Sequence, residues 1–276
     1  TAEIKYVLDS FWLLISGCLV MWMAAGFAML EAGLVRTKNT TAILTKNITL
    51  YAIACVAYYY VGYNLMYGSG NSFVGSGVMM SGTSADGHSL ISDFFFQVVF
   101  VATAASIVSG TVAERIKFWP FIGFILVLTG VIYPIQGHWS WGGTSLGGLI
   151  DGFSDFAGST IVHSVGGWAG LAGVLLLGAR KGKFGSDGSV HPIPGSNLPL
   201  ATLGTFVLWL GWFGFNGGSQ LALGSKDDVD AISAVIANTN IAACAGALAA
   251  MILTQIFYKR VDLTMVLNGA LSGLLA

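Results

Sequence analysis

The sequence has little charge. Asp, Glu, Lys and Arg make up only 9% of its 276 residues, whereas soluble domains carry about 25%. Hydrophobic residues account for 55%, and the formal net charge is −1. This composition excludes an ordinary soluble domain and gives no basis for nucleic-acid binding. It predicts an integral membrane protein that has the lipid bilayer as its surroundings.

Cysteine is also scarce, and its three residues are scattered. Cys18, Cys55 and Cys244 fall in separate apolar runs, so they form neither a disulfide framework nor a metal-ligand set. The sequence contains no P-loop, HExxH, CxxC or nucleophile elbow. We therefore expect no catalytic residues, no metal and no cofactor, and a protein that is not an enzyme.

Long apolar runs predict eight helices, at about 9–34, 47–67, 93–113, 119–141, 156–178, 198–220, 231–258 and from 262. The stretches between them are a Gly/Ser-rich loop at Ser69–Ser89, a tight turn at Glu114–Phe118, a Gly-rich stretch at Gly142–Gly152, a basic turn at Arg180–Lys183 and an acidic loop at Lys226–Asp230. No charged or low-complexity linker divides the chain. We expect one membrane domain over 1–276.

The two ends of the sequence suggest a piece of a longer protein. The chain begins at Thr1 without an initiator methionine. This fits either a removed signal peptide or an N-terminus that was set by the experimenter. The last apolar run stops at Ala276, although a spanning helix needs about 20 residues. We expect the domain to be truncated at its C-terminus.

The positions of Lys and Arg predict the orientation. With eight helices, only Lys5 and Lys226 fall on one side, and ten cations fall on the other: Arg36, Lys38, Lys46, Arg115, Lys117, Arg180, Lys181, Lys183, Lys259 and Arg260. Lys and Arg accumulate in cytoplasmic loops. The pattern predicts an integral protein of the cell (inner) membrane with its N-terminus outside.

The run that starts at Asp155 holds an unusual histidine. Asp155 stands where a helix N-cap belongs, and His163 follows eight residues later, roughly 12 Å along the helix. This spacing places an ionisable side chain near the middle of a bilayer about 30 Å thick. Such residues are costly there and usually face a pathway. The alternative is a histidine that only bonds a neighbouring helix.

Aromatic residues gather at the same outer level under this topology. Phe96 and Phe100 lie four residues apart, as do Phe215 and Ser219, and Trp141 ends its helix. An aromatic face attracts a small cation by about 0.5–2 kcal/mol. A serine hydroxyl accepts a hydrogen bond, and a carboxylate at Asp155 would make the potential negative.

For each of these residues, a purely structural role is an alternative to cation binding. Trp139 and Trp141 would also suit an interfacial belt, and the phenylalanines would suit packing. Ser219 would allow close helix contact, and Asp155 would serve as an N-cap alone. Their coincidence at one depth favours a cation site. The other titratable groups look unremarkable: Glu31 lies near a helix end, Glu114 is expected to pair with Arg115, and His88 and His191 fall in loops.

Several motifs along the chain carry a family resemblance. They are Glu31-Ala-Gly-Leu-Val-Arg36-Thr-Lys-Asn39, Phe96-Gln-Val-Val-Phe100, Ala113-Glu-Arg-Ile116, Trp141-Gly-Gly143, Asp155-Phe-Ala-Gly158 with His163, and Trp212-Phe-Gly-Phe-Asn-Gly-Gly-Ser219. With them the sequence resembles the ammonium transporter family (Amt, with Mep and Rh proteins as relatives) over essentially its whole length. The resemblance implies an all-α membrane protein, a multi-helix transmembrane bundle of eleven helices with inverted repeats, about eight of which this chain covers.

The resemblance also implies an outer recruitment site, a gate and a pore histidine. These are Phe100, Trp141 and Ser219 for ammonium recruitment, Phe100 and Phe215 for the gate, and His163 for the pore, supported by Asp155, Phe96 and Ala157. His163 would be the first of two pore histidines, and the second belongs to a helix after Ala276.

The function implied is transmembrane transport of ammonium or ammonia. NH₄⁺ (or methylammonium) would be recruited at the aromatic site and deprotonated, and NH₃ would pass through a hydrophobic pore lined by histidine. The alternative is an ammonium sensor whose membrane domain binds NH₄⁺ and signals to a fused cytoplasmic domain. The family resemblance further implies a homotrimer and a cytoplasmic PII-type regulator or fused signalling domain as partners. The net charge of −1 predicts no nucleic-acid partner.

Overall fold

The computed structural model describes residues 2–77, 84 and 87–276 of the chain. It divides into two compact units. Unit 1 consists of Thr1–Leu30, Ser81–Gln97 and Leu198–Ala276, and unit 2 consists of Glu31–Met80 and Val98–Asn197. Part of the predicted Gly/Ser-rich loop at Ser69–Ser89 lies outside the described residues.

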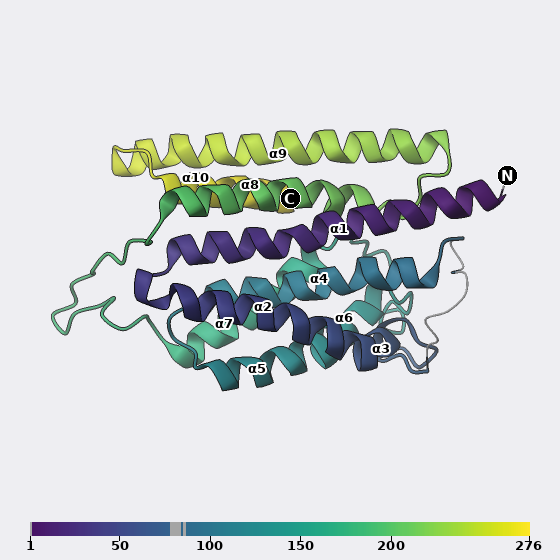
Figure 1. Cartoon of the computed structure of the whole chain (residues 1–276), viewed down its shortest axis with the longest axis horizontal. Coiled ribbons are helices and arrows are strands. Elements are labelled where there is room, and N and C mark those ends of the chain that lie inside the picture. The colour runs from purple at the N-terminus through teal and green to yellow at the C-terminus, as the bar shows by residue number, and fades with distance from the viewer. Residues whose placement is uncertain (1, 78–83, 85–86) are drawn as a thin grey trace. The chain divides into compact units, whose positions relative to one another are not determined.

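The described residues are helical, apart from turns, loops and one isolated bridge between Phe184 and Val190 (Figure 1). The α-helices are α1 (Ala2–Leu34), α2 (Thr40–Ala57), α3 (Tyr63–Tyr67), α4 (Leu90–Thr111), α5 (Phe118–Val127), α6 (Tyr133–Ser140), α7 (Val165–Leu177), α8 (Leu198–Gly218), α9 (Lys226–Tyr258) and α10 (Leu263–Leu275). In the part of the chain that is described, seven continuous helical segments are long and apolar enough to cross a membrane, and α10 is a shorter apolar helix. This confirms the predicted multi-helix membrane fold.

Three predicted boundaries are wrong. The first helix was expected from about residue 9, but α1 begins at Ala2. The second helix was expected from about residue 47, but a short 3-10 turn, η1 (Thr37–Asn39), leads directly into α2 at Thr40. The acidic loop expected at Lys226–Asp230 is instead the first turn of α9. Ser225 caps that turn by accepting a hydrogen bond from the Asp228 N–H. Acidic residues are favourable at a helix N-terminus, so their charge does not indicate a loop there.

Three spanning segments contain a π-helical turn that apolar patterning does not predict. These turns are η2 (Tyr58–Gly62), η3 (Leu128–Ile132) and η4 (Ser159–Ser164). Each one interrupts the regular spacing of side chains along its helix, and such turns are frequent at functional sites. The turn η4 contains His163.

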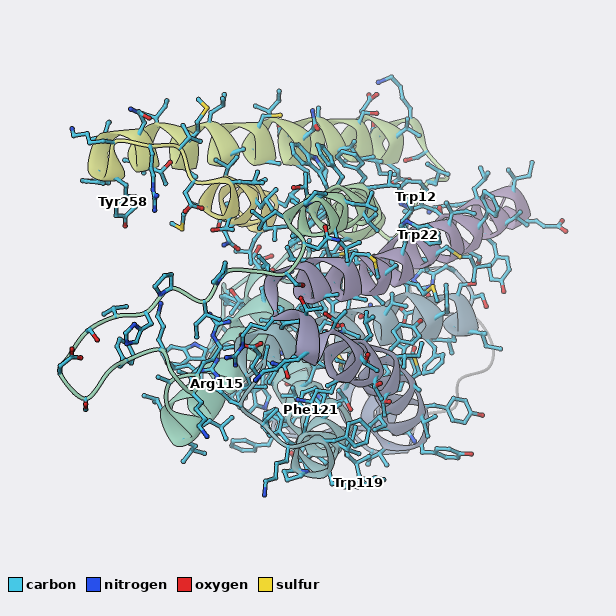
Figure 2. The ribbon with its side chains drawn as sticks, turned by 60° about the vertical axis from the view of Figure 1, so that its left-hand side comes forward. Trp12, Trp22, Arg115, Trp119, Phe121 and Tyr258 are labelled. Atoms are coloured by element: carbon cyan, nitrogen blue, oxygen red, sulfur yellow. The ribbon has the colours of Figure 1, made fainter. Side chains whose placement is uncertain are left out.

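Many large apolar side chains lie exposed on the outer surfaces of the helices. Trp119 on α5 is 77% exposed, whereas Phe121, two residues later, is fully buried (Figure 2). Leu175 and Leu176 on α7 are 75% and 88% exposed. Helices with apolar residues on their outer faces suit lipid, where tails cover that surface. Phe121 belongs instead to a buried cluster in unit 2 with Leu50 and other apolar residues.

The basic connections of unit 2 meet at one carboxylate. The Glu114 side chain is fully buried and accepts hydrogen bonds from the Arg36 N–H (2.9 Å), the Arg36 Nε (3.1 Å) and Asn39 (2.6 Å). Arg180 adds an ion pair at 3.4 Å. The expected local pairing of Glu114 with Arg115 is therefore wrong. Arg115 turns away to the main-chain carbonyl of Gly178.

These contacts set the ionisation of Glu114. Burial raises the pKa of its carboxyl, but the hydrogen bonds from Arg36 and Asn39 outweigh this effect and lower the pKa to about 2. Residues from three separate connections thus join at one end of unit 2, which we call the basic end. Glu31, which looked unremarkable in the sequence, is buried near this end and accepts hydrogen bonds from Asn47 (2.9 Å) and Ser109 (2.8 Å).

Candidate functional site

Asp155 organises the start of the helix that holds His163. The helix begins at Ser159, and its N-cap position is occupied by Gly158 with φ 112°, so the expectation that Asp155 is the N-cap residue is wrong. Its carboxylate nevertheless accepts hydrogen bonds from the main-chain N–H groups of Gly158 (2.9 Å), Thr160 (2.9 Å) and Ile161 (2.8 Å). Asp155 therefore performs the chemistry of a cap from three residues further back, because glycine permits the left-handed bend.

His163 lies closer to the helix start than predicted. It is four residues after Ser159, so it is about 6 Å along the helix rather than 12 Å. The side chain is 8% exposed, and its Nδ1 is 3.2 Å from the Gly158 carbonyl oxygen. A carbonyl only accepts, so this bond requires the proton on Nδ1. In the neutral ring, Nε2 is then the acceptor nitrogen.

Trp141 connects this helix start to α4. Its indole Nε1 donates to the Asp155 carbonyl oxygen at 2.7 Å, and its ring lies edge-on to Phe100 with centroids 6.1 Å apart. Phe100 is 1% exposed, while Trp141 and Asp155 are half-buried. The indole N–H of Trp141 is thus already bonded to the protein's own main chain. Unit 2 brings together Phe100, Trp141, Asp155 and His163, and the half-buried Ala157 follows Asp155 in the same loop.

The remaining predicted residues belong to unit 1. Phe215 is 1% exposed near the end of α8, and Ser219 follows that helix. The Ser219 hydroxyl donates to the Phe215 carbonyl at 2.8 Å, which leaves its oxygen as an acceptor for an N–H donor. Phe96 is buried beside Gly218. The predicted gate of Phe100 and Phe215 pairs residues of different units and stays a prediction.

Sequence reasoning missed a polar residue that supports the site. Gln136 on α6 donates its Nε2 to the Ile161 carbonyl at 3.0 Å and so holds η4 from the side. An amide in the middle of an apolar helix is costly unless it is bonded, and this was the available signal. Gly158 was visible as part of the Asp155-Phe-Ala-Gly158 motif, although its left-handed backbone was not.

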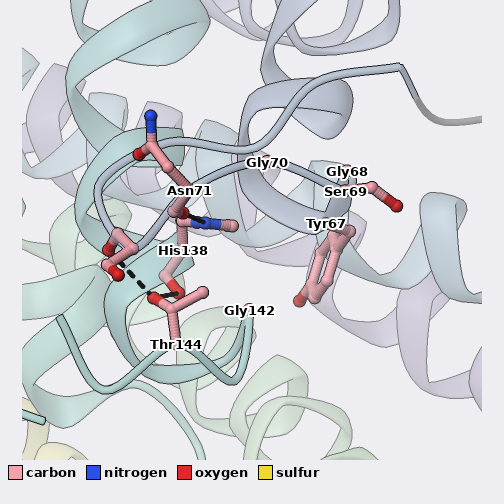
Figure 3. Close-up of a pocket in the computed structure, with 9 residues that line it drawn as sticks. Tyr67, Gly68, Ser69, Gly70, Asn71, His138, Gly142 and Thr144 are labelled. Atoms are coloured by element: carbon pink, nitrogen blue, oxygen red, sulfur yellow. Dashed lines mark hydrogen bonds between the residues drawn. The ribbon is translucent and has the colours of Figure 1, made fainter. Parts of the chain in front are cut away.

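A polar pocket of about 540 Å³ lies in unit 2 at the end of α6 (Figure 3). It is lined by Tyr67, Gly68, Ser69, Gly70, Asn71, Ser72, His138, Gly142 and Thr144. The Thr144 hydroxyl lies within hydrogen-bond distance of the Ser72 carbonyl oxygen (3.2 Å) and the His138 carbonyl oxygen (3.0 Å), and its single proton serves one of them at a time. Within the described ranges, no group of three or more His, Cys, Asp or Glu residues is placed to hold a metal ion.

Comparison with known proteins matches nearly the whole chain to one protein family. A model of the Ammonium Transporter Family matches residues 11–276. The chain is 47% identical to the ammonium transporter Amt2 of Archaeoglobus fulgidus over 97% of its own length and 58% of the relative's. It is 42% identical to a putative ammonium transporter of Synechocystis, covering 99% of itself and 63% of that protein. The chain thus spans about six-tenths of the length of these curated relatives.

Solved structures share the fold. The structure described as a sensor Amt protein superimposes with a TM-score of 0.92 at 38% identity, over 100% of this chain and 69% of that one. Mep2 of Candida albicans gives a TM-score of 0.84 at 28% identity, over 99% of this chain and 60% of that one. Both resemblances extend over all the helices described above.

Proposed function

Because the chain belongs to the ammonium transporter family, we propose that it is the larger part of a membrane protein that recruits ammonium and conducts ammonia. The observation that carries the proposal is the linked group in unit 2, in which the Asp155 loop connects the Trp141 ring to the His163 helix. The Trp141 indole bonds the main-chain carbonyl of Asp155, and the Asp155 carboxylate and the His163 imidazole both bond the main chain of Gly158.

The recruitment step uses ring faces and one oxygen. NH₄⁺ binds against Phe100 and Trp141, each worth about 0.5–2 kcal/mol as water is removed. Ser219 accepts one N–H of the cation, because its own proton is already given to Phe215. The Asp155 carboxylate adds a negative potential nearby, although its oxygens are occupied by main-chain N–H groups. This arrangement favours a small cation with N–H donors.

Loss of a proton then permits passage. Moving a bare cation into a dry, apolar conduit costs on the order of tens of kcal/mol in the Born limit. Neutral ammonia avoids that cost, so NH₄⁺ gives up a proton at or below the gate of Phe100 and Phe215, and either water on the outer side or Nε2 of His163 accepts that proton. His163, with its proton on Nδ1, presents Nε2 as a hydrogen-bond acceptor for ammonia. The chain works as a homotrimer with its N-terminus outside and its basic end in the cytoplasm.

An ammonium sensor is the second candidate. The observation that favours it is the TM-score of 0.92 with the structure described as a sensor Amt protein. A sensor would bind the same cation at the same residues and signal to a fused cytoplasmic domain, and a PII-type regulator would act from the same side. Both functions share recruitment and differ in flux.

Flux through the complete protein in liposomes tests the proposal. We expect ammonium uptake to exceed that of empty liposomes and His163→Ala to reduce or alter it, while methylammonium competes. Saturable binding of methylammonium without flux would instead support the sensor. Absence of both binding and flux, or a His163→Ala variant identical to the parent in rate and selectivity, would contradict the proposed mechanism.

A further inference from the structure

Asp9, near the start of α1, is a carboxylate with three hydrogen-bond donors around it. Its side chain is fully buried. One oxygen, Oδ1, accepts hydrogen bonds from the main-chain N–H groups of Leu223 (2.6 Å) and Gly224 (2.8 Å). The other oxygen, Oδ2, accepts a hydrogen bond from the Lys5 Nζ at 2.6 Å. A buried carboxylate is costly unless its oxygens are bonded, and these three donors meet that need.

These bonds join segments of unit 1 that are far apart in the sequence. Asp9 and Leu223 are separated by 214 positions, and Leu223 and Gly224 belong to the half-buried connection of residues 219–225 between α8 and α9. A β-carbon at Gly224 would lie against the Lys5 Cγ and 3.1 Å from the Asp9 Oδ1. Glycine at this position therefore lets the main chain approach the carboxylate closely enough to bond it.

The chain that leaves α8 takes a conformation that needs support. The Leu221 N–H donates to the Gly218 carbonyl at 2.9 Å, which closes a turn that contains Ser219. Leu221 itself has φ 59°, in the left-handed region that a residue with a β-carbon adopts only at a cost. Such a conformation persists where surrounding contacts fix it. The two N–H groups that Asp9 accepts follow two and three residues later, so they fix the chain directly after this turn.

A second contact from α1 holds the chain before Ser219. Trp12 follows Asp9 by three residues, so both side chains lie on neighbouring positions of one helix face. The Trp12 Nε1 donates to the Gly217 carbonyl at 3.3 Å. Ser219 therefore stands between two points at which α1 bonds the main chain, Gly217 on one side and Leu223 on the other.

We propose that Asp9 is a positioning residue for Ser219 and that it acts through the main chain of the 219–225 connection. This role rests on the proposed recruitment role of Ser219. The Ser219 hydroxyl donates to the Phe215 carbonyl, so the direction of its acceptor oxygen depends on how the main chain runs at Ser219. Without the Asp9 carboxylate, two N–H groups lose their acceptor and the left-handed turn at Leu221 relaxes. The Ser219 oxygen then leaves the position in which it accepts an N–H of ammonium.

Hydrogen exchange in the full-length protein tests the contact without any ligand. We expect the main-chain amides of Leu223 and Gly224 to exchange slowly in the parent and about tenfold or more faster in Asp9→Ala, because their acceptor is gone. Glu3→Gln is the control, since Glu3 is an exposed carboxylate in the first turn of the same helix, and it should exchange as the parent does. Fast exchange of both amides in the parent, or unchanged exchange in Asp9→Ala, would overturn the proposal.

A milder pair of substitutions serves if Asp9→Ala does not fold. Asp9→Asn keeps one oxygen for the Leu223 and Gly224 N–H groups but turns its amide NH₂ toward Lys5, so that donor faces donor. Adding Lys5→Gln supplies an oxygen that accepts from this amide four residues away. We expect Asp9→Asn to bind methylammonium about tenfold more weakly than the parent, and the double variant to regain most of that affinity. An Asp9→Asn variant with parental affinity, or a double variant as weak as Asp9→Asn, would contradict the positioning role.

A double-mutant cycle with Ser219→Ala tests whether the effect passes through Ser219. We expect Asp9→Asn to weaken methylammonium binding in the parent but to change the affinity of Ser219→Ala by less than about twofold, because the residue that Asp9 positions is then absent. Equal losses of affinity in both backgrounds would show that Asp9 acts only on the fold. If the parent binds no methylammonium, or Ser219→Ala binds it as the parent does, the proposed recruitment step fails instead. The exchange result then still decides whether Asp9 holds the connection.

Discussion

The two units hold their shares of the proposed site by different means. In unit 2, Asp155 fixes Trp141 and the start of η4 through hydrogen bonds to its carboxylate and carbonyl. In unit 1, Phe215 and Ser219 stand at the end of α8, which lies directly against α1. The first arrangement depends on charge and bonding geometry, whereas the contact of α8 with α1 depends on the absence of side-chain volume.

Glycines make the unit 1 contact close. A β-carbon at Gly214 would lie 2.5 Å from the Leu19 Cβ and 2.7 Å from the Ser16 carbonyl oxygen. One at Gly218 would lie 2.5 Å from the Ser16 Cβ and 2.7 Å from the Phe96 ring. Such separations leave no room for a methyl group. The comparison teaches that the share of the site in unit 2 should respond to the loss of polar groups, and the packing of α8 in unit 1 to added volume.

Removing the Asp155 carboxylate should give the largest effect. Asp155→Ala leaves three main-chain N–H groups without their acceptor, and we expect a loss of about 4 kcal/mol in unfolding free energy together with loss of flux. Unfolding in detergent and liposome flux measure the two effects. Asp155→Asn keeps one oxygen acceptor and should retain part of the stability. A change below about 1 kcal/mol for Asp155→Ala would contradict the role assigned to the carboxylate.

Acid should weaken the contacts of the Glu114 carboxylate in unit 2. The pKa of Glu114 in the folded protein, about 2, lies below its ordinary value of 4.5, so ionised Glu114 stabilises the fold above pH 4.5. That contribution, about 3 kcal/mol, is lost as the pH falls from about 4.5 to about 2.

The matched variant for this prediction is Glu114→Gln, which removes the charge at every pH. The difference in melting temperature between parent and variant should be largest near pH 7 and should shrink as the solution is acidified. A difference that stays constant from pH 7 to pH 3 would show that the ionisation of Glu114 does not contribute.

Added volume should disturb unit 1 to an intermediate extent. Gly218→Ala places a methyl group against Ser16 and Phe96, and we expect a destabilisation of about 2 kcal/mol with little dependence on pH. Gly167→Ala on α7 is the control, because a β-carbon there meets nothing within 4 Å. Equal melting temperatures for the two variants would remove the distinction between the units.

The smallest expected effect is on ligand affinity at Trp141. Trp141→Leu removes the ring face and should weaken methylammonium binding by about tenfold, which corresponds to about 1.4 kcal/mol. Trp141→Phe keeps a ring but loses the bond to the Asp155 carbonyl, and should weaken binding by about threefold. Equal affinity in all three proteins would favour the interfacial-belt interpretation of Trp141.

Sequence reasoning was most successful where a property repeats along the helix. Among the described residues, the seven spanning segments and the shorter α10 were all predicted, because spanning a bilayer demands long apolar runs that composition reveals. The sequence indicated that Asp155 bonds the first N–H groups of a helix, but it did not indicate how many residues separate Asp155 from the first helical residue. The helix begins at Ser159, after the left-handed Gly158, so His163 lies closer to the helix start than its distance from Asp155 predicts.

Partners that are distant in the chain escaped prediction. Glu114 was expected to pair with its neighbour Arg115, and instead it joins Arg36 and Arg180, residues 78 and 66 positions away. Nothing in local spacing distinguishes these cations from the others at the basic end. The choice depends on which connections the packed helices bring together.

The sequence by itself determined that the chain is a membrane bundle, because lipid selects apolar residues position by position, and it named the residue types of the candidate site. Only the tertiary structure decided how those residues are held. Asp155, Trp141 and His138 are fixed largely through main-chain N–H and carbonyl groups. Every residue except proline carries the same two main-chain groups, so the amino-acid sequence does not indicate which residues supply these hydrogen-bond partners.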